Sequence, residues 1–410
     1  MIDKIIEFST RNRLTILVGI IALVIWGTAS LFKLPIDAIP DITNKQVTII
    51  TLCPSLGPVE VEQFVTSPIE IEMSNIKGLD QVRSISKFGL SSVTVVFDDE
   101  TDLYWARQQV FERLSTVQEN LPANAGKPQL APITTGIGEI YQYVLKPKDP
   151  NNKSFSLMEL RTIQDWVIRK NLLGSPGVAD ISSFGGYKKE YHARIKPERL
   201  RAFNVTINEL YEALRQGNNN TGGAYIEKDR RSYIIRGVGL AKNIEDIRNT
   251  YIKLNNNVPV LVKEVADVEL GNSTRYGAMT MNGTGEVVGA VVLLQMGENA
   301  SDVIKKLEVR LEEVSKLLPE GLEIQPFINR EELVSKTIQT VAKNLLEGAI
   351  VVLIVLFLFL GDLRASLIAA SVIPLAMLFT FGMMNAVGVI GNLMSLGALD
   401  FGLIVDGSVI

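Results

Sequence analysis

The sequence predicts a polytopic α-helical membrane protein in which α/β subdomains are inserted between transmembrane helices. Three observations support this fold class. The long uncharged stretches gather at the two ends of the 410-residue chain, and such stretches are long enough to cross a bilayer. The segment between them alternates strand-like and helix-like patterns. Within that segment a similar unit occurs twice, as expected for duplicated βαβ units.

The first transmembrane helix is predicted over residues 13–33, after a cytoplasmic N-terminus at residues 1–12. Residues 14–32 carry no charge and no proline. At about 1.5 Å per residue, this stretch can span a hydrocarbon core of about 30 Å. Lys4, Arg11 and Arg13 precede it, and this basic flank favours a cytoplasmic N-terminus. A cleaved signal peptide is the alternative, although no small-residue cleavage site follows the run.

Three further transmembrane helices are predicted near the C-terminal end, over residues 330–360, 365–389 and 391–410. Pro374 is tolerated inside the second because neighbouring helices can satisfy the freed carbonyl group. These crossings place residues 34–335 outside the cytoplasm and the turn at Arg364 on the cytoplasmic side, as the positive-inside rule prefers. Because the sequence stops within the last span, we expect it to be a fragment of a longer polytopic protein.

The region between the membrane ends begins with an α/β unit. Strands are predicted at 46–52, 82–86 and 93–97, the last two as a hairpin around Gly89. Helices are predicted at 59–76 and 103–121, where apolar residues follow the helical period.

A second α/β unit begins with a strand at 140–145 and a helix at 157–172. The stretch 177–183 repeats the pattern of residues 78–84, and the alternation of residues 191–195 resembles that of 93–97. Units of split βαβ, ferredoxin-like topology account for this echo. Coincidence is the alternative, since few residues are identical.

A long β-hairpin is predicted over residues 224–238, after a helix at 200–215. Its tip is the charged run Lys228-Asp229-Arg230-Arg231, so the hairpin is a candidate contact arm to another subunit. A solvated hairpin with no partner is the alternative. A strand at 287–294, a helix at 300–318 and a strand at 322–327 complete the region.

The composition excludes several classes of function. Forty-one basic and 45 acidic residues give a net charge of −4, which argues against a nucleic-acid partner. The single cysteine, Cys53, and the single histidine, His192, exclude disulfide frameworks, CxxC zinc sites and His-rich metal centres. The phosphate-binding loops of ATP-driven transporters are absent. We expect no cofactor, and no metal-binding residues can be named.

Asp400 and Asp406 are the candidate functional residues, since both lie in the uncharged span 391–410. An aspartate at the bilayer centre costs about 2.5–3.5 kcal/mol on insertion scales, and burial raises the pKa of a carboxyl group. Such groups can couple a proton gradient to conformational change. At about 100° per residue the two carboxylates lie about 240° apart on a helix, so they are predicted as separate proton stations. A structural role, pairing with neighbouring helices, is the alternative.

Several motifs resemble the resistance–nodulation–division (RND) efflux pumps over essentially the whole chain. Residues 35–44, Pro-Ile-Asp-Ala-Ile-Pro-Asp-Ile-Thr-Asn, resemble the exit of the first membrane helix of these pumps. Residues 344–349 and 358–365 resemble their second helix and the turn after it. Residues 392–407, with Asp400-Phe401-Gly402 and Asp406-Gly407, resemble the fourth helix of the heavy-metal branch, and are similar to its cobalt–zinc–cadmium type.

The resemblance implies a homotrimeric inner-membrane permease with a large periplasmic domain that exchanges divalent metal cations for protons. A periplasmic adaptor and an outer-membrane channel would complete the conduit. Asp400 and Asp406 match the proton-relay carboxylates of the family. Residues 34–134 would form the first porter subdomain, residues 135–186 and 274–329 the second, and residues 187–273 a docking subdomain whose hairpin reaches the next subunit.

Two other functions remain open at this point. An RND exporter of organic compounds would need a large aromatic-lined pocket, and this region is only modestly aromatic. A membrane-anchored binding or sensor protein would not need the intramembrane carboxylates. One departure from the family is Asn329-Arg330, where its members usually have Asp-Arg.

Overall fold

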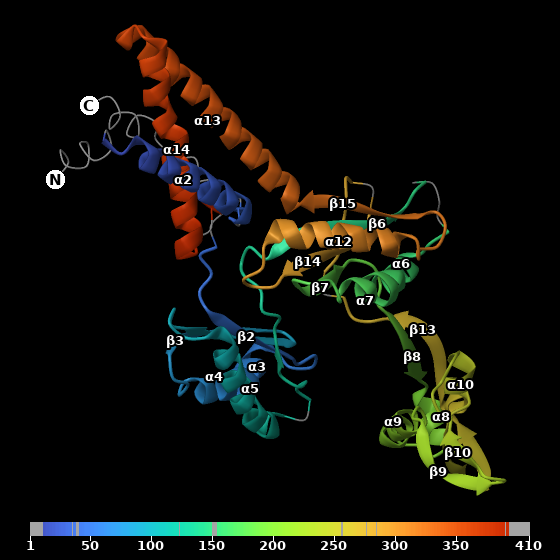
Figure 1. The fold of residues 1–410 in the computed structure, drawn as a ribbon. Helices are drawn as coiled ribbons and strands as arrows, with labels where there is room; N and C mark the ends of the chain where they lie inside the picture. The colour runs from blue at the N-terminus through green and yellow to red at the C-terminus, as the bar shows by residue number, and fades with distance from the viewer. Residues whose placement is uncertain are drawn as a thin grey trace.

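The structure is a computed structural model that describes residues 11–34, 36–37, 41–122, 124–149, 154–255, 257–275, 277–283, 285–389 and 391–392. Within these residues, long apolar helices lie together at one end of the molecule, and three α/β units, here called the first, second and third unit, lie beyond them (Figure 1). Each unit has its own cluster of buried apolar side chains.

The first unit is a four-stranded sheet with its helices on one face. The strand order is β3-β4-β2-β5, and each strand is antiparallel to its neighbours. This is the split βαβ topology expected from the sequence. Its elements are β2 (Gln46–Leu52), α3 (Pro58–Val61), η1 (Glu62–Thr66), α4 (Ser67–Met73), β3 (Leu79–Lys87), β4 (Leu90–Phe97), α5 (Leu103–Asn120) and β5 (Gln129–Leu130).

The second unit repeats this topology. Its strand order, β15-β6-β14-β7, again places the first and third strands of the unit at the centre and is antiparallel throughout. Its elements are β6 (Glu139–Pro147), α6 (Leu157–Ile163), η2 (Gln164–Ile168), α7 (Arg169–Leu172), β7 (Val178–Phe184), β14 (Val288–Leu294), α12 (Ala300–Ser315) and β15 (Leu322–Asn329).

The two units share local details that confirm the duplication. Gly78 and Gly177 each precede the second strand of their unit, with φ angles of +76° and +83° that favour glycine. The first helical segment of each unit contains a π-helical turn, η1 or η2. One part of the expected echo is wrong: residues 191–195 are not equivalent to 93–97. The equivalent strand is β14, because the chain leaves the sheet after β7 and returns only at residue 288.

The third unit is formed by the segment of chain between β7 and β14. Its strands β8 and β13 form an antiparallel ribbon that joins it to the second unit. The single helix expected over 200–215 is divided in two, because Asn204 adopts a φ of +51° and Thr206 caps the second helix. The elements are β8 (Lys189–Ile195), α8 (Pro197–Ala202), α9 (Ile207–Gln216), β9 (Thr221–Lys228), β10 (Arg231–Gly237), α10 (Ile244–Arg248), β11 (Tyr251–Asn255), β12 (Val258–Leu261), α11 (Val262–Val265) and β13 (Ala266–Asn272).

The expected hairpin is present as β9 and β10. Asp229 and Arg230 form its two-residue turn with φ angles of +52° and +60°, the conformation that joins tightly twisted strands. Every residue of both strands is exposed.

The apolar helices are α2 (Arg13–Lys33), α13 (Arg330–Leu360) and α14 (Leu363–Val387). Two of them, α2 and α14, are long and apolar enough to cross a membrane, and α13 contains a shorter apolar stretch, Leu346–Phe359. The helix predicted at 365–389 ends earlier, at Val387, because Gly388 adopts a left-handed conformation with φ +76°. Gly391 and Asn392, where a further helix was expected to begin, instead form the short strand β16. The rest of that span, 393–410, lies outside the described residues.

Candidate functional site

The predicted relay residues, Asp400 and Asp406, lie outside the residues that the structure describes. What is described is the segment just before them. The strand β16 (Gly391–Asn392) pairs in parallel with β1 (Ile36–Asp37), so residues 391 and 392 stand opposite 36 and 37. Because β1 follows α2 closely in the chain, the segment that leads to both aspartates begins beside the exit of the first apolar helix.

The helices α2 and α14 pack closely because glycines face the partner helix. A Cβ atom on Gly27 would lie 2.6 Å from the carbonyl oxygen of Leu378, and one on Gly382 would lie 2.4 Å from the ring of Trp26. The Trp26 ring also meets Phe379 edge to face, with centroids 6.3 Å apart. Small residues at such contacts let helix backbones approach each other inside a membrane.

The strand β15 continues into α13 without a loop. Asn329 is the last residue of the strand and caps the helix, since its side chain accepts a hydrogen bond of 3.0 Å from the Glu331 amide. Its amide group also donates to the Glu308 carboxylate on α12 over 2.9 Å. Arg330 is 8% exposed and donates to the carbonyl of Ile137, before β6. The start of α13 is therefore held by hydrogen bonds to α12 and to Ile137 and is continuous with β15.

In the sequence, Asn329-Arg330 stands out only as a departure from the family pattern, and this junction could not be predicted from it. The partners lie 21 and 193 residues away in the chain, so no local pattern could reveal them. The burial of Arg330, which indicates that it has partners because arginine is rarely buried without them, is visible only in the structure.

Two buried tyrosines lie on β6 beneath the helices of the second unit. The hydroxyl of Tyr143 accepts a hydrogen bond of 3.1 Å from the buried amide of Gln164, and burial raises the pKa of Tyr143 strongly. Burial also raises the pKa of Tyr141 to about 12, with a further contribution from the nearby carboxylates of Glu308 and Glu332. Both phenols therefore stay protonated at neutral pH.

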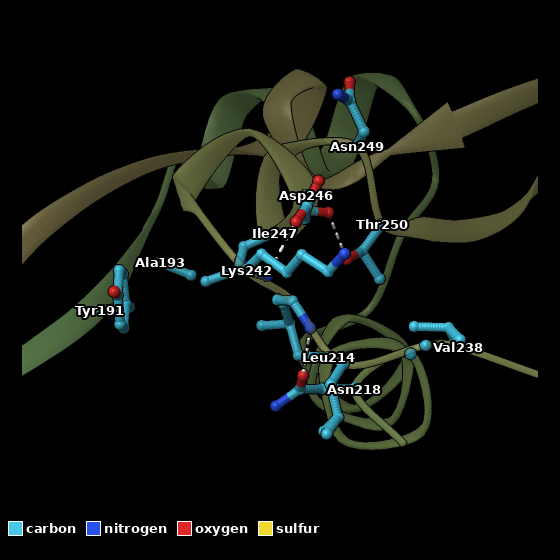
Figure 2. A pocket seen from close by; sticks show the side chains of 14 residues that line it. Tyr191, Ala193, Leu214, Asn218, Val238, Lys242, Asp246, Ile247, Asn249 and Thr250 are labelled. Carbon is cyan, nitrogen blue, oxygen red and sulfur yellow. Dashed lines mark hydrogen bonds between the residues drawn. The ribbon is translucent and has the colours of Figure 1, made fainter. Parts of the chain in front are cut away.

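A hollow of about 570 Å³ lies at the base of the hairpin in the third unit, and Figure 2 shows the side chains around it. Its polar groups mainly hold the surrounding loops. The Asp246 carboxylate accepts from the Lys242 amide over 2.8 Å, and the Asn218 side chain accepts from the Ala241 amide over 2.8 Å. This arrangement offers no set of metal ligands.

No group of three or more His, Cys, Asp or Glu side chains suited to a metal ion occurs in the part of the chain that the structure describes. Cys53 is buried after β2, and burial raises the pKa of its thiol. His192 lies on β8, 3.4 Å from the Glu190 carboxylate. Methionine thioethers suit soft metal ions, but Met279 and Met281 lie in the loop before β14, whereas Met383 and Met384 lie in α14.

Comparisons with known proteins match the chain over its whole length. Protein HelA of Legionella pneumophila is 46% identical over 412 residues, which cover 100% of this chain and 39% of that protein. The cobalt-zinc-cadmium resistance protein CzcA of Cupriavidus metallidurans is 43% identical over 414 residues, with the same coverage of 100% and 39%. A crystal structure of a heavy metal efflux pump superposes with a TM-score of 0.88 at 36% identity, covering 98% of this chain and 40% of that one.

The chain therefore spans about two fifths of the length of the curated relatives it matches. The family model described as the AcrB/AcrD/AcrF family matches residues 5–410. The α/β units and sheets of this chain are those of the porter fold of the AcrB/AcrD/AcrF family. This chain belongs to the AcrB/AcrD/AcrF family, that is, to the RND proteins that its sequence motifs resemble.

Proposed function

We propose that this chain is the N-terminal part of an inner-membrane permease that exports divalent cations of the zinc, cobalt, cadmium and nickel class in exchange for protons. It is a secondary active transporter and not an enzyme. The observation that carries this proposal is the 43% identity to a cobalt-zinc-cadmium resistance protein along the complete chain. The Asp400-Phe401-Gly402 motif agrees with the same branch.

The apolar helices support a polytopic membrane protein. Most of the large apolar side chains of α2 and α14 face outward, as in Leu17, Ile25 and Ile368, which are 57%, 65% and 71% exposed. Water would penalise such a surface, whereas a bilayer core accommodates it. Residues 13–33, 330–360, 365–389 and 391–410 are proposed as four transmembrane segments, with residues 1–12 in the cytoplasm.

The division of the periplasmic region is proposed as the sequence suggests. Residues 34–134 form the first porter subdomain, residues 135–186 with 274–329 the second, and residues 187–273 the docking subdomain. The three separate buried clusters support this division, since each draws its residues from one of these ranges. The exposed hairpin β9–β10 would reach the next subunit of a homotrimer, and a periplasmic adaptor and an outer-membrane channel would complete the export path.

Transport would depend on Asp400 and Asp406 as the proton relay. The pairing of β1 with β16 supports their placement near the first helix, because it brings the start of their segment to the exit of α2. Protonation removes the cost of a charge in the bilayer core, so each proton taken up or released would change which helix arrangement is favoured. Movement would then pass to the periplasmic units through α13, which is fixed to the second unit at Asn329 and Arg330.

The proposal is tested by the metal sensitivity of a pump-deleted cell that expresses the complete gene with its partner proteins. We expect protection against zinc, cobalt, cadmium or nickel, and its loss in Asp406→Asn although the protein still assembles. An exposed aspartate outside the membrane helices, Asp99, provides the control variant Asp99→Asn, which should retain protection. Protection only against organic compounds would favour an exporter of such compounds. No protection of any kind would favour a binding or sensor role.

A further inference from the structure

A groove of about 740 Å³ lies along β7, η2 and α7 of the second unit. Leu52, at the end of β2 in the first unit, closes one side of it, so the groove lies where the two units meet. We call it the basic groove. The residues that line it are Leu52, Arg161, Asp165, Trp166, Arg169, Lys170, Asp180, Ile181, Ser182, Ser183 and Lys188.

The charge of the basic groove is not balanced. Four cationic and two anionic side chains line it, a surplus of two positive charges. The carboxylates are already paired, Asp165 with Arg161 at 2.9 Å and Asp180 with Arg169 at 2.8 Å. The surplus therefore rests on Lys170 and Lys188, whose side chains are both exposed.

The two arginines do not form a cradle for a small anion, because further hydrogen bonds fix them in place. Arg161 donates to the carbonyl of Gly185 over 2.8 Å, and Arg169 donates to the carbonyl of Ile181 over 2.7 Å. A phosphate-sized ligand would need several donors that converge on one point. The basic groove instead offers two exposed lysines from different elements, Lys170 on α7 and Lys188 after β7, which suits a ligand that carries more than one negative charge along its length.

Trp166 adds an apolar contact surface beside these lysines. It is 64% exposed, and the Lys170 ammonium lies 4.0 Å from its ring centroid. The residue occupies the middle of the π-helical turn η2, a type of turn that is frequent at functional sites. Phe64 holds the same position in η1 and is also exposed, so an aromatic at this turn belongs to the duplicated unit. Tryptophan is enriched among the residues that contribute most to the binding energy of protein interfaces.

We propose that the basic groove binds an acidic, partly apolar segment of a partner polypeptide, whose carboxylates meet Lys170 and Lys188 and whose apolar side chains cover Trp166 and Leu52. Because Leu52 belongs to the first unit and the lysines to the second, the bound segment contacts both units. The proposal does not depend on which cation is exported. Binding is measured on the purified protein, so its failure would leave the proposed transport function unaffected.

The test uses the complete protein purified in detergent and a fluorescent peptide of alternating glutamate and valine. A peptide of alternating lysine and valine controls for apolar binding, and inorganic phosphate is the small-anion competitor. We expect the acidic peptide to bind in a salt-dependent manner and to lose about tenfold in affinity when Lys170→Glu and Lys188→Glu are combined. Trp166→Ala should weaken binding by a similar factor at unchanged salt dependence.

Lys316→Glu, an exposed lysine at the end of α12 outside the basic groove, is the matched control and should leave binding unchanged. A melting temperature for each variant shows that it is folded, and Lys170→Gln with Lys188→Gln is the milder substitute if charge reversal disturbs folding. Equal binding of the basic peptide, equal loss in the Lys316→Glu control, displacement by phosphate, or no binding of the acidic peptide would each overturn the proposal.

Discussion

Gly27 and Gly382 show at the scale of single residues why α2 and α14 can lie so close. A Cβ atom at either position would fall within 2.6 Å of atoms of the partner helix. We predict that Gly27→Val and Gly382→Val each lower the stability of the complete protein by about 1–3 kcal/mol, the usual cost of overpacking. The measurement is the melting temperature in detergent.

The matched control for these variants is Gly19→Val. Gly19 lies in the same helix as Gly27, but a Cβ atom there would meet nothing within 4 Å. The change in intrinsic helix propensity when valine replaces glycine is common to all three variants. An equal loss in Gly19→Val would show that helix propensity, and not the α2–α14 contact, explains the effect.

The burial of Tyr141 makes the free energy of unfolding depend on pH in the alkaline range. Its pKa in the folded protein is about 12, above the ordinary value of 10.0, so the folded chain holds the phenol proton more tightly than the unfolded chain. This contribution is fully present below pH 10 and is lost as the pH rises toward 12. It amounts to about 2–3 kcal/mol.

We therefore predict that Tyr141→Phe weakens the loss of stability over that alkaline range. The measurement is the melting temperature of the complete protein as a function of pH, with exposed Tyr211 as the control in Tyr211→Phe. If both variants follow the wild-type pH profile, burial of Tyr141 does not contribute in this way.

At the scale of elements, the sequence pattern predicted most helices and strands because their apolar periodicity is local. The prediction was wrong where a contact between residues distant in the sequence, or a left-handed backbone conformation, determines the local structure. Residues 191–195 alternate like a strand of the duplicated sheet, but they pair with β13. The helix over 200–215 is divided by the left-handed conformation of Asn204. Gly391 and Asn392 form a strand because they pair with β1. No local sequence pattern predicts a pairing between residues so far apart in the chain.

The junction of β15 and α13 leads to a prediction at this scale. A Gly-Gly insertion between Asn329 and Arg330 would separate the strand from the helix, and the bonds to Glu308 and Ile137 could no longer hold both in one position. We expect transport to be lost while the protein still assembles in the membrane. Metal resistance of cells and the amount of folded protein are measured together.

The control is the same insertion in the exposed turn at Asp99 and Glu100, before α5. It adds the same flexibility to the first unit without touching α13, and resistance should persist. If the junction insertion also left resistance intact, α13 would not transmit movement through β15.

At the scale of the whole molecule, the long apolar helices near the two ends and the duplicated α/β units could be predicted from the sequence, since both depend on composition and repetition along the chain. The cation-transport assignment rested instead on the motif that contains Asp400 and Asp406, and these residues lie outside the described part of the chain. The described part contributes the α2–α14 contact, the β1–β16 pair that precedes this motif in the chain, and the junction of β15 with α13.

The central claim, that protons drive the export of divalent cations through Asp406, is tested most directly in proteoliposomes that contain the complete protein and a zinc-sensitive dye. An imposed pH gradient should drive zinc movement in the wild type, and zinc should in turn move protons. Asp406→Asn should abolish both fluxes while zinc binding and assembly persist. Zinc movement that is independent of the pH gradient, or that continues in Asp406→Asn at the wild-type rate, would contradict the account.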